Sequence, residues 1–284
     1  MKKVLTIIVS YNFEPWLTKC LDSLLQSTYP TDIFVIDNAS SDHTVARIQQ
    51  DYPQVILRQS DKNLGFGRAN NLGFDYAITN RYDVVFLVNQ DAWVQSSCLQ
   101  HLMEEDYGPN VGIVSPMHYD GTGEQLDQGF AGYIKAGQAN LSSFPVPFVN
   151  AAFWLIPVPV LKQVGLFAPI FYHYGEDSDY ANRIKYHGMH LIVSRRAIAY
   201  HDRQNRNNVS RAQFFQREYI YFLTEYANVN HSFFSAFAYG VVAPIKKAFL
   251  RSSSSHAGLL PYLAIAFKVL AQTAAVYHTR KRNA

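Results

Sequence analysis

Residues 83–91 read Asp-Val-Val-Phe-Leu-Val-Asn-Gln-Asp, an apolar run that ends in two amides and a carboxylate. A short run rich in valine predicts a buried strand, and its polar end then lies at the carboxyl edge of a sheet, where open α/β sheets bind ligands. Asp91 is therefore a candidate ligand of a hard divalent cation such as Mg²⁺ or Mn²⁺, because these ions prefer oxygen ligands. The alternative is that Asp91 caps a helix predicted over residues 96–105.

The rest of the N-terminal half repeats this pattern. Short apolar runs alternate with segments of helical periodicity, which predicts βαβ units and a mostly parallel central sheet with helices on both faces. The predicted strands are 4–9, 33–36, 55–57 and 84–88, and the predicted helices are 15–27, 41–51 and 66–80.

Composition changes near residue 108, where glycine, proline and aromatic residues become frequent. Short strands are expected there, over 112–116, 129–134 and 148–156, and they suit a mixed-sheet region that shapes an acceptor pocket. The predicted organisation is an α/β domain over 1–205, with a nucleotide-binding half at 1–107 and an acceptor-binding half at 108–205, followed by a helical extension over 206–284.

Composition also excludes some classes of protein. The chain has 284 residues and a net charge of +3, and no continuous basic face is evident, so nucleic acid is not an expected partner. Cys20 and Cys98 lack metal-ligand spacing and are expected to be buried thiols in a reducing compartment. The apolar run 4–9 is too short for a signal peptide, so a cytoplasmic location is expected.

The C-terminal extension contains a mostly apolar segment, 257–278, followed by three basic residues at 280–282. Lys268 and Pro261 argue against a spanning helix, because a charge at mid-bilayer costs about 3 kcal/mol. In-plane contact with the inner leaflet of a membrane, packing in the core and true spanning all remain open. Serines 252–255 are expected to form a hinge between helices over 233–250 and 257–278.

Polar residues end the first two predicted strands, as Ser-Tyr-Asn at 10–12 and Asp-Asn-Ala-Ser-Ser-Asp at 37–42. At adjacent strand ends an aromatic ring can stack on a base and a carboxylate can accept from a base N–H or from ribose hydroxyls. Tyr11 and Asp37 are therefore candidates for binding a nucleoside. Ser41 or Asp42 is expected to cap the following helix.

The segment 61–71, Asp-Lys-Asn-Leu-Gly-Phe-Gly-Arg-Ala-Asn-Asn, combines glycines, a helix start and cationic side chains. Such a turn can bring backbone N–H groups and Arg68 close to a diphosphate, although an ordinary helix-opening loop explains the pattern equally well. No glycine follows the first strand, which disfavours a dinucleotide-binding oxidoreductase.

Three acids, Glu176, Asp177 and Asp179, open a predicted helix that ends near Gly188. The helix dipole stabilises acids at this end, so capping is one explanation. A carboxylate left free there could instead accept a proton from a sugar hydroxyl as a general base. His201 ends a strand expected to be short, and it is either a structural or surface residue or a metal ligand.

Taken in order, five motifs resemble those of family 2 glycosyltransferases and are most similar to the rhamnosyltransferase-like branch. They are TIIVSYN at 6–12, VIDNASSD at 35–42, NLGFGRANNLG at 63–73, LVNQDA at 87–92 and GEDSDYANRIKYHG at 175–188. The resemblance covers residues 4–202, and the last eighty residues carry no matching motif.

The resemblance implies a GT-A fold, a nucleotide-sugar donor, Mn²⁺ or Mg²⁺, and inversion at the anomeric carbon. It also implies roles for individual side chains. Tyr11 and Asp37 would lie beside the nucleoside, Asn63, Arg68 and Asn70 near the base or diphosphate, Asn89 on the donor and Asp91 on the metal, and Asp177 would be the catalytic base. Apart from the resemblance, His201 is a second candidate metal ligand, and Glu176 and Asp179 are candidates for the acceptor side. Asn89 stands where many members have the first acid of a DxD motif, which removes one charge from the metal site.

The activity that the resemblance implies is transfer of a single sugar, from dTDP-rhamnose or a UDP-hexose, to a glycan or polyprenyl-linked acceptor in cell-surface polysaccharide synthesis. Such a protein would be cytoplasmic and could contact the inner membrane leaflet. The alternative is a non-catalytic member of the same fold that binds a nucleotide or a glycan, and Asn89 motivates it.

Overall fold

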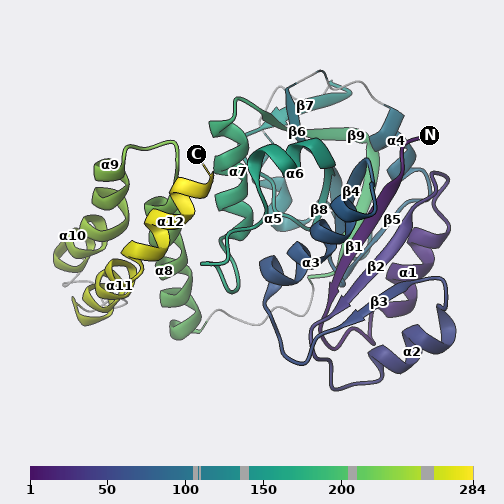
Figure 1. Ribbon diagram of the computed structural model, residues 1–284, viewed down its shortest axis with the longest axis horizontal. Helices are drawn as coiled ribbons and strands as arrows, with labels where there is room; N and C mark the ends of the chain where they lie inside the picture. Colours follow the sequence, from purple (N-terminus) through teal and green to yellow (C-terminus); the bar gives the residue numbers. More distant parts are fainter. Residues whose placement is uncertain (105–107, 109, 135–140, 204–209, 251–258, 284) are drawn as a thin grey trace. The chain divides into compact units, whose positions relative to one another are not determined.

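The computed structural model describes residues 1–284 except 105–107, 109, 135–140, 204–209, 251–258 and 284 (Figure 1). The chain forms two compact units. The first consists of Met1–Leu166 and Gly188–Arg206, and the second of Phe167–His187 and Asn207–Ala284. This division differs from a domain boundary at 205, because residues 167–187 belong to the second unit.

The first unit is built on a mixed sheet. Its order is β3-β2-β1-β4-β8-β6-β9-β5, with β7 paired to β9. The strands are β1 (Val4–Ser10), β2 (Asp32–Asp37), β3 (Ile56–Gln59), β4 (Val84–Val88), β5 (Ala92–Val94), β6 (Val111–Asp120), β7 (Ser143–Val146), β8 (Phe153–Pro157) and β9 (His190–His201).

The N-terminal half of this sheet is parallel, as the alternating pattern predicted. β1 pairs in parallel with β2 on one side and with β4 on the other, and β2 pairs in parallel with β3. Strand order therefore reverses between β1 and β4, and the crevice outside the carboxyl ends of strands at such a switch point is where open α/β sheets bind ligands. β8 then pairs antiparallel with β4 and β6, and β9 pairs in parallel with β6 and antiparallel with β5 and β7.

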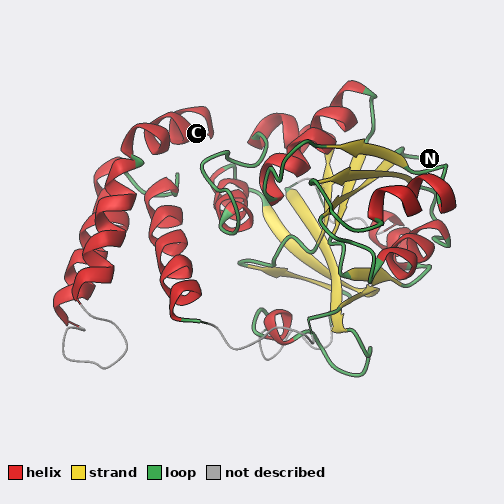
Figure 2. Ribbon diagram, turned by 90° about the horizontal axis from the view of Figure 1, so that it is seen from below, coloured by secondary structure: helices red, strands yellow, loops and turns green. Residues whose placement is uncertain are grey.

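Helices cover both faces of the sheet in the first unit (Figure 2). α1 and α4 supply buried leucines and both free cysteines to the core on one face. α3 covers the other face, where a Cβ at Gly73 would lie 2.7 Å from Ile7, so glycine permits this close approach. The helices of this unit are α1 (Leu17–Leu25), α2 (Thr44–Asp51), α3 (Phe66–Thr79), α4 (Cys98–Glu104), α5 (Gln128–Ala131) and α6 (Val158–Val164).

Two predictions for the second half of the sheet were wrong. Residues 129–134 were expected to form a strand, but Asp127 accepts a hydrogen bond from the Phe130 N–H and starts the short helix α5 there. The strand that ends at His201 is β9, twelve residues long rather than short, because it pairs with β5, β6 and β7.

The second unit is helical. Its core contains buried aromatic and aliphatic side chains from several of its helices. The elements are α7 (Glu176–Tyr186), α8 (Arg211–Ala227), α9 (Phe233–Phe237), a π-helical turn η1 (Ala238–Val242), α10 (Ala243–Leu250), α11 (Leu259–Ala271) and α12 (Thr273–Asn283). The single helix expected over 257–278 is instead two helices, bent by 55° at residue 272. The expected serine hinge at 252–255 lies outside the described residues.

Candidate functional site

The loops that follow β1 and β2 are tied together at the carboxyl edge of the sheet. Asp37 is buried, and its carboxylate accepts hydrogen bonds from the Ser10 hydroxyl at 3.0 Å and from the Ser40 N–H at 3.0 Å and hydroxyl at 2.5 Å. In this structure Asp37 holds the loop after β2 in place, and its role toward the nucleoside stays a prediction.

Two residues in these loops have positive φ although neither is glycine: Asn12 (φ 51°) and Ala39 (φ 66°). The Asn12 side chain stabilises this conformation by accepting the Ser41 N–H at 2.9 Å. Such backbone is uncommon and clusters at ligand sites. Beside it, Tyr11 has a half-exposed ring, and its backbone exchanges two hydrogen bonds with the Gln90 side chain. Gln90, which sequence analysis missed, links the ends of β1 and β4.

The glycine-containing loop before α3 packs beside the end of β2. Asn38 accepts the Leu64 N–H at 2.9 Å, and Asn63 accepts the Gly65 N–H at 2.9 Å. Asn70 is buried and donates to the Phe66 carbonyl within α3, and its contact with the base or diphosphate stays a prediction. The Arg68 side chain is exposed on α3.

Asp91 and His201 come together although 110 residues separate them. Antiparallel pairing of β5 with β9 aligns Ala92 with His201, and the Asp202 N–H donates to the Asp91 carbonyl at 2.8 Å. The His201 Nε2 then lies 3.2 Å from the Asp91 Oδ1. Asp91 is followed by a strand, so the alternative that it caps the next helix was wrong. Asn89 also lies here, with its Nδ2 3.5 Å from the same ring nitrogen.

The other side of the His201 ring faces two residues that sequence analysis missed. The Arg203 Nε–H donates to His201 Nδ1 at 3.0 Å and also lies 3.1 Å from Asp127 Oδ2. Asp127 Oδ2 itself is 3.8 Å from the same ring nitrogen. Since Nδ1 accepts from Arg203, the proton of a neutral His201 sits on Nε2, where it donates to Asp91. In the sequence Asp127 shows only the pattern of a helix cap.

A pocket of about 730 Å³ opens beside these groups. Its lining includes Asp120 and Asp127, the His201 ring and the Arg203 side chain. Carboxylates, an amide and a guanidinium around a cavity of this size can exchange hydrogen bonds with a sugar ring, because its hydroxyls both donate and accept.

The residues present are compatible with a divalent cation. A carboxylate and an imidazole nitrogen 3.2 Å apart are a donor pair that Mn²⁺ accepts. Within the described part of the chain no cluster of three or more such side chains forms a complete protein cage. Asp91 and His201 would therefore share the ion with phosphate oxygens, as is usual for ions that act on nucleotides. Binding at Nε2 would require the ring proton to move to Nδ1, on the side of Asp127.

The second unit holds the other predicted acids, at the start of α7. Two successive residues before the helix have positive φ, Tyr174 (68°) and Gly175 (92°). Gly175 also lacks room for a side chain, because a Cβ would lie 2.7 Å from Ile220 and 2.8 Å from Phe171. This constrained turn sets the direction of the first helical residues.

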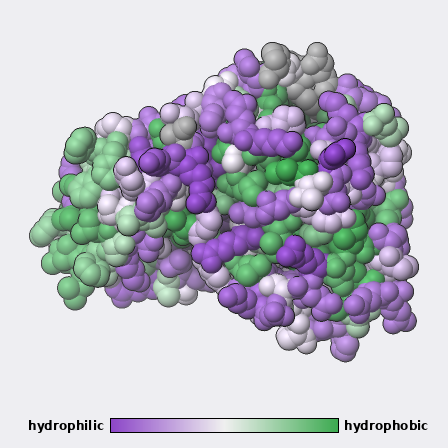
Figure 3. Space-filling view, in the orientation of Figure 1, coloured by the Kyte–Doolittle hydropathy of each residue, from purple (hydrophilic) through white to green (hydrophobic). Residues whose placement is uncertain are grey.

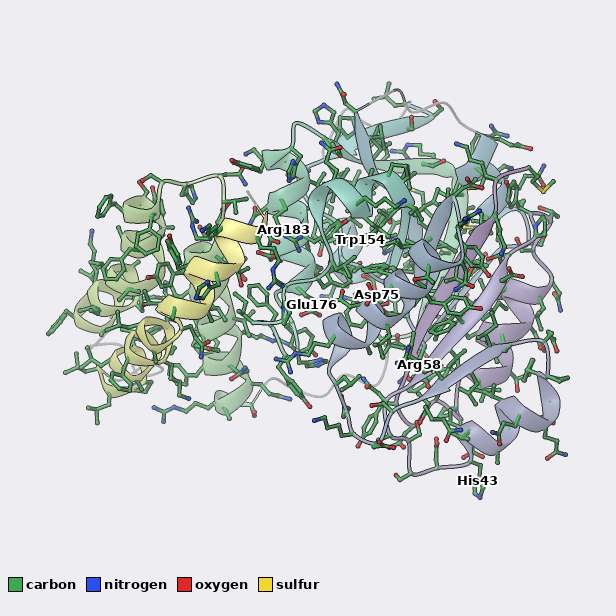
Figure 4. The ribbon with its side chains drawn as sticks, in the orientation of Figure 1. His43, Arg58, Asp75, Trp154, Glu176 and Arg183 are labelled. Carbon is green, nitrogen blue, oxygen red and sulfur yellow. The ribbon has the colours of Figure 1, made fainter. Side chains whose placement is uncertain are left out.

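Burial separates the three acids of α7. Asp179 forms a buried ion pair with Arg183 at 3.0 Å, and its place on the acceptor side stays a prediction. Glu176 is also buried (Figure 4), and burial, reinforced by the charge of Asp177, raises its pKa from 4.5 to about 8. Glu176 is therefore mostly protonated at neutral pH. Asp177 is the member of this trio whose side chain is partly exposed.

Comparison with known proteins identifies the family of the chain. The sequence model for glycosyl transferase family 2 matches residues 6–165. An N-acetylglucosaminyl-diphospho-decaprenol L-rhamnosyltransferase from Mycobacterium tuberculosis is 27% identical over 218 residues, covering 65% of this chain and 71% of that protein. Glycosyltransferase GlyA from Streptococcus pneumoniae is 28% identical over 116 residues, covering 39% of this chain but 16% of its own length.

A solved structure shares the fold. The mannosyltransferase PcManGT from Pyrobaculum calidifontis, in complex with GDP-Man and Mn²⁺, has a TM-score of 0.63 at 18% identity, covering 99% of this chain and 87% of that one. At this identity the likeness concerns the fold, which is the GT-A type that the motifs predicted. The family match extends over more than half of the chain and includes the sheet edge with Asp37 and Asp91. The chain belongs to glycosyl transferase family 2.

Proposed function

We propose that this glycosyltransferase moves a single sugar from a nucleotide-sugar donor, with inversion, to a glycan or polyprenyl-linked acceptor in cell-surface polysaccharide synthesis. The observation that carries the proposal is the Asp91–His201 pair at the switch point of the sheet, beside a polar pocket. dTDP-rhamnose is the first candidate donor, because a relative that covers 65% of this chain is a rhamnosyltransferase. A UDP-hexose is the second.

At the donor end, the chain supplies groups for each part of the nucleotide sugar. The half-exposed Tyr11 ring would stack on the base, and the exposed Arg68 would lie near the diphosphate. Asp91 and His201 would hold Mn²⁺ or Mg²⁺, which when bound neutralises the charge that grows on the departing nucleoside diphosphate. The pocket beside Asp127 and Arg203 would take the sugar ring.

At the acceptor end, Asp177 would act as general base. Its carboxylate takes the proton of the acceptor hydroxyl while that oxygen bonds to the anomeric carbon, and the bond from this carbon to the diphosphate oxygen breaks on the opposite face. One displacement of this kind inverts the configuration. Asp177 is assigned this role because Glu176 is mostly neutral at pH 7 and Asp177 is the partly exposed acid of the helix start.

Thermal unfolding with UDP, dTDP and GDP, each with and without Mn²⁺, tests the donor site. A ligand at roughly a hundred times its Kd adds about 2.7 kcal/mol to the free energy of unfolding. We expect a Mn²⁺-dependent rise in Tm with one nucleotide, and that nucleotide names the donor class.

A transfer assay then tests catalysis, with the matching nucleotide sugar and a polyprenyl-diphosphate acceptor. Product of inverted anomeric configuration supports the proposal. Nucleotide binding without transfer or donor hydrolysis would favour the non-catalytic alternative, which Asn89 motivates because it removes one charge beside Asp91.

A further inference from the structure

The helices at the C-terminus carry apolar side chains on their outward faces as well as in their core. From Phe233 to Leu250, one stripe is buried, at Ala236, Gly240, Pro244 and Ala248. A Cβ at Gly240 would lie 2.4 Å from the Tyr226 Cβ, so this stripe packs tightly on α8. The opposite stripe is exposed and also apolar, and it consists of Phe234, Ala238, Val242, Ile245 and Phe249.

The neighbouring helix α11 repeats this arrangement. Tyr262 and Val269 are buried in the core of the second unit, whereas Leu260 and Phe267 are 75% and 73% exposed. α10 and α11 pack against each other. Figure 3 shows apolar residues gathered over α9, α10 and α11. We name as the apolar face the exposed side chains Phe234, Val242, Ile245, Phe249, Leu250, Leu260, Phe267 and Leu270.

The charge of this region has one sign. Residues 226–284 contain none of the 22 acidic residues of the chain and seven of its 25 lysines and arginines. Some of these cations serve the fold: Lys247 bonds to Glu218 on α8, and Arg280 donates to the carbonyls of Asn228 and His231. Lys246 and Lys268 are exposed next to apolar-face residues in the sequence.

We propose that the apolar face docks on the surface of a bilayer containing anionic lipids, with the helices lying in its plane. Exposed phenylalanines and leucines would enter the acyl boundary while Lys246 and Lys268 reach the headgroups. A second copy of the chain is a poorer occupant of this face, because two surfaces with cations and no acids in this region repel each other. The inference deepens the proposed function, since a polyprenyl-linked acceptor lies in such a surface, but docking itself requires no catalysis.

In-plane binding fits the structure better than spanning. Among the described residues, Phe233–Leu250 alone is long and apolar enough to cross a membrane as one straight helix, and Leu259–Ala271 with Thr273–Asn283 passes only as a bent pair. Eighteen residues of helix extend about 27 Å, less than the roughly 30 Å of a hydrocarbon core. The same helix packs on α8, where Lys247 bonds to Glu218. If this helix crossed the bilayer, the charged residues of α8 would lie in the hydrocarbon core, which is costly.

Vesicle flotation of the full chain tests the proposal, with phosphatidylcholine vesicles that contain or lack phosphatidylglycerol. We expect binding to the anionic vesicles and a more than tenfold loss in the triple variant Phe234→Ser, Phe249→Ser and Phe267→Ser. Lys246→Gln with Lys268→Gln should weaken binding to anionic vesicles about fivefold per lysine, the equivalent of about 1 kcal/mol each. The matched control is Leu25→Ser with Leu141→Ser, which removes two exposed leucines of the first unit.

Other outcomes overturn the proposal. They are a wild-type chain that does not float with anionic vesicles, a triple variant that floats like the wild type, or a wild-type dimer that the triple variant abolishes while flotation is unchanged. The triple variant should keep the wild-type Tm and its nucleotide-dependent rise. That readout separates a failure of docking from a failure of the proposed transfer function.

Discussion

The carboxyl edge of the sheet and the start of α7 both carry clustered acids, but they control those acids in different ways. At the sheet edge, strand pairing brings distant residues together, and Asp37, Asp91 and Asp127 each accept hydrogen bonds or face a cation. At the start of α7, three acids adjacent in sequence are separated by burial. One is neutral and one is ion-paired, and Asp177 is partly exposed.

This difference shows two ways in which a folded chain can accommodate several acids close together. Hydrogen-bond donors and cations beside a carboxylate compensate for the water that it loses, which suits a site for a metal and a diphosphate. A carboxyl without such a partner takes up a proton when it is buried, as Glu176 does. The helix start therefore leaves one acid partly exposed, Asp177, whereas the sheet edge gathers several paired polar groups.

The largest expected effect is at the helix start. Asp177→Asn should lower turnover by about 10² to 10⁴, the usual contribution of a positioned base, with donor binding and Tm unchanged. Asp179→Asn is the matched control: it removes the carboxylate charge that pairs with buried Arg183, so it should lower the free energy of unfolding by about 3–5 kcal/mol. Steady-state kinetics and thermal unfolding separate the two, and full turnover in Asp177→Asn would remove this residue from catalysis.

At the sheet edge, Asp91→Asn should lower turnover by about 10² to 10³, because one preorganised group that stabilises the leaving charge is lost. It should also abolish the Mn²⁺-dependent part of the nucleotide shift in Tm. Asp51→Asn, an exposed acid at the end of α2, is the control. A variant at Asp91 that still responds to Mn²⁺ would place the metal elsewhere.

A smaller effect is expected at Asp127, which lies beside His201 rather than beside the proposed metal. Asp127→Asn should weaken Mn²⁺ affinity by about ten- to a hundredfold, because Asp127 is the carboxylate on the Nδ1 side of His201 and would hold that ring once Nε2 binds metal. Titration of Mn²⁺ by electron paramagnetic resonance measures this without turnover. Glu124→Gln changes an exposed acid on the same turn and should match the wild type. Equal affinity in both variants would remove Asp127 from metal binding.

The smallest effect concerns Glu176, whose pKa rises from 4.5 to about 8 in the folded chain. Between these values the unfolded chain loses the proton and the folded chain keeps it, so this group lowers stability as pH rises through that window. Glu176→Gln lacks the effect, so its Tm relative to the wild type should increase from pH 5 to pH 8. Parallel Tm curves for the two proteins over this range would show that Glu176 is ionised.

Much of the first unit was predictable because its signals are local. Valine-rich runs and helical periodicity located β1 to β4 and α1 to α3 within a few residues. Residues 129–134 were misassigned because the Asp127 cap outweighs the β propensity of that stretch. Hydropathy showed residues 257–278 as one continuous apolar segment, so a single helix was expected. The bend at residue 272 depends on packing, which a hydropathy pattern does not report.

Sequence by itself determined the class of the protein, since five ordered motifs and a strand ending in Asn-Gln-Asp specify the fold and its ligand-binding edge. Tertiary structure alone decided which polar side chains lie together and which of them are exposed. Pairing of β5 with β9 brings His201 to Asp91, the 120–127 turn brings Asp127 to the same ring, and burial distinguishes Asp177 from its neighbours. The physical reason is that ionisation and hydrogen bonding depend on which atoms replace water around a group, and those atoms come from distant parts of the chain.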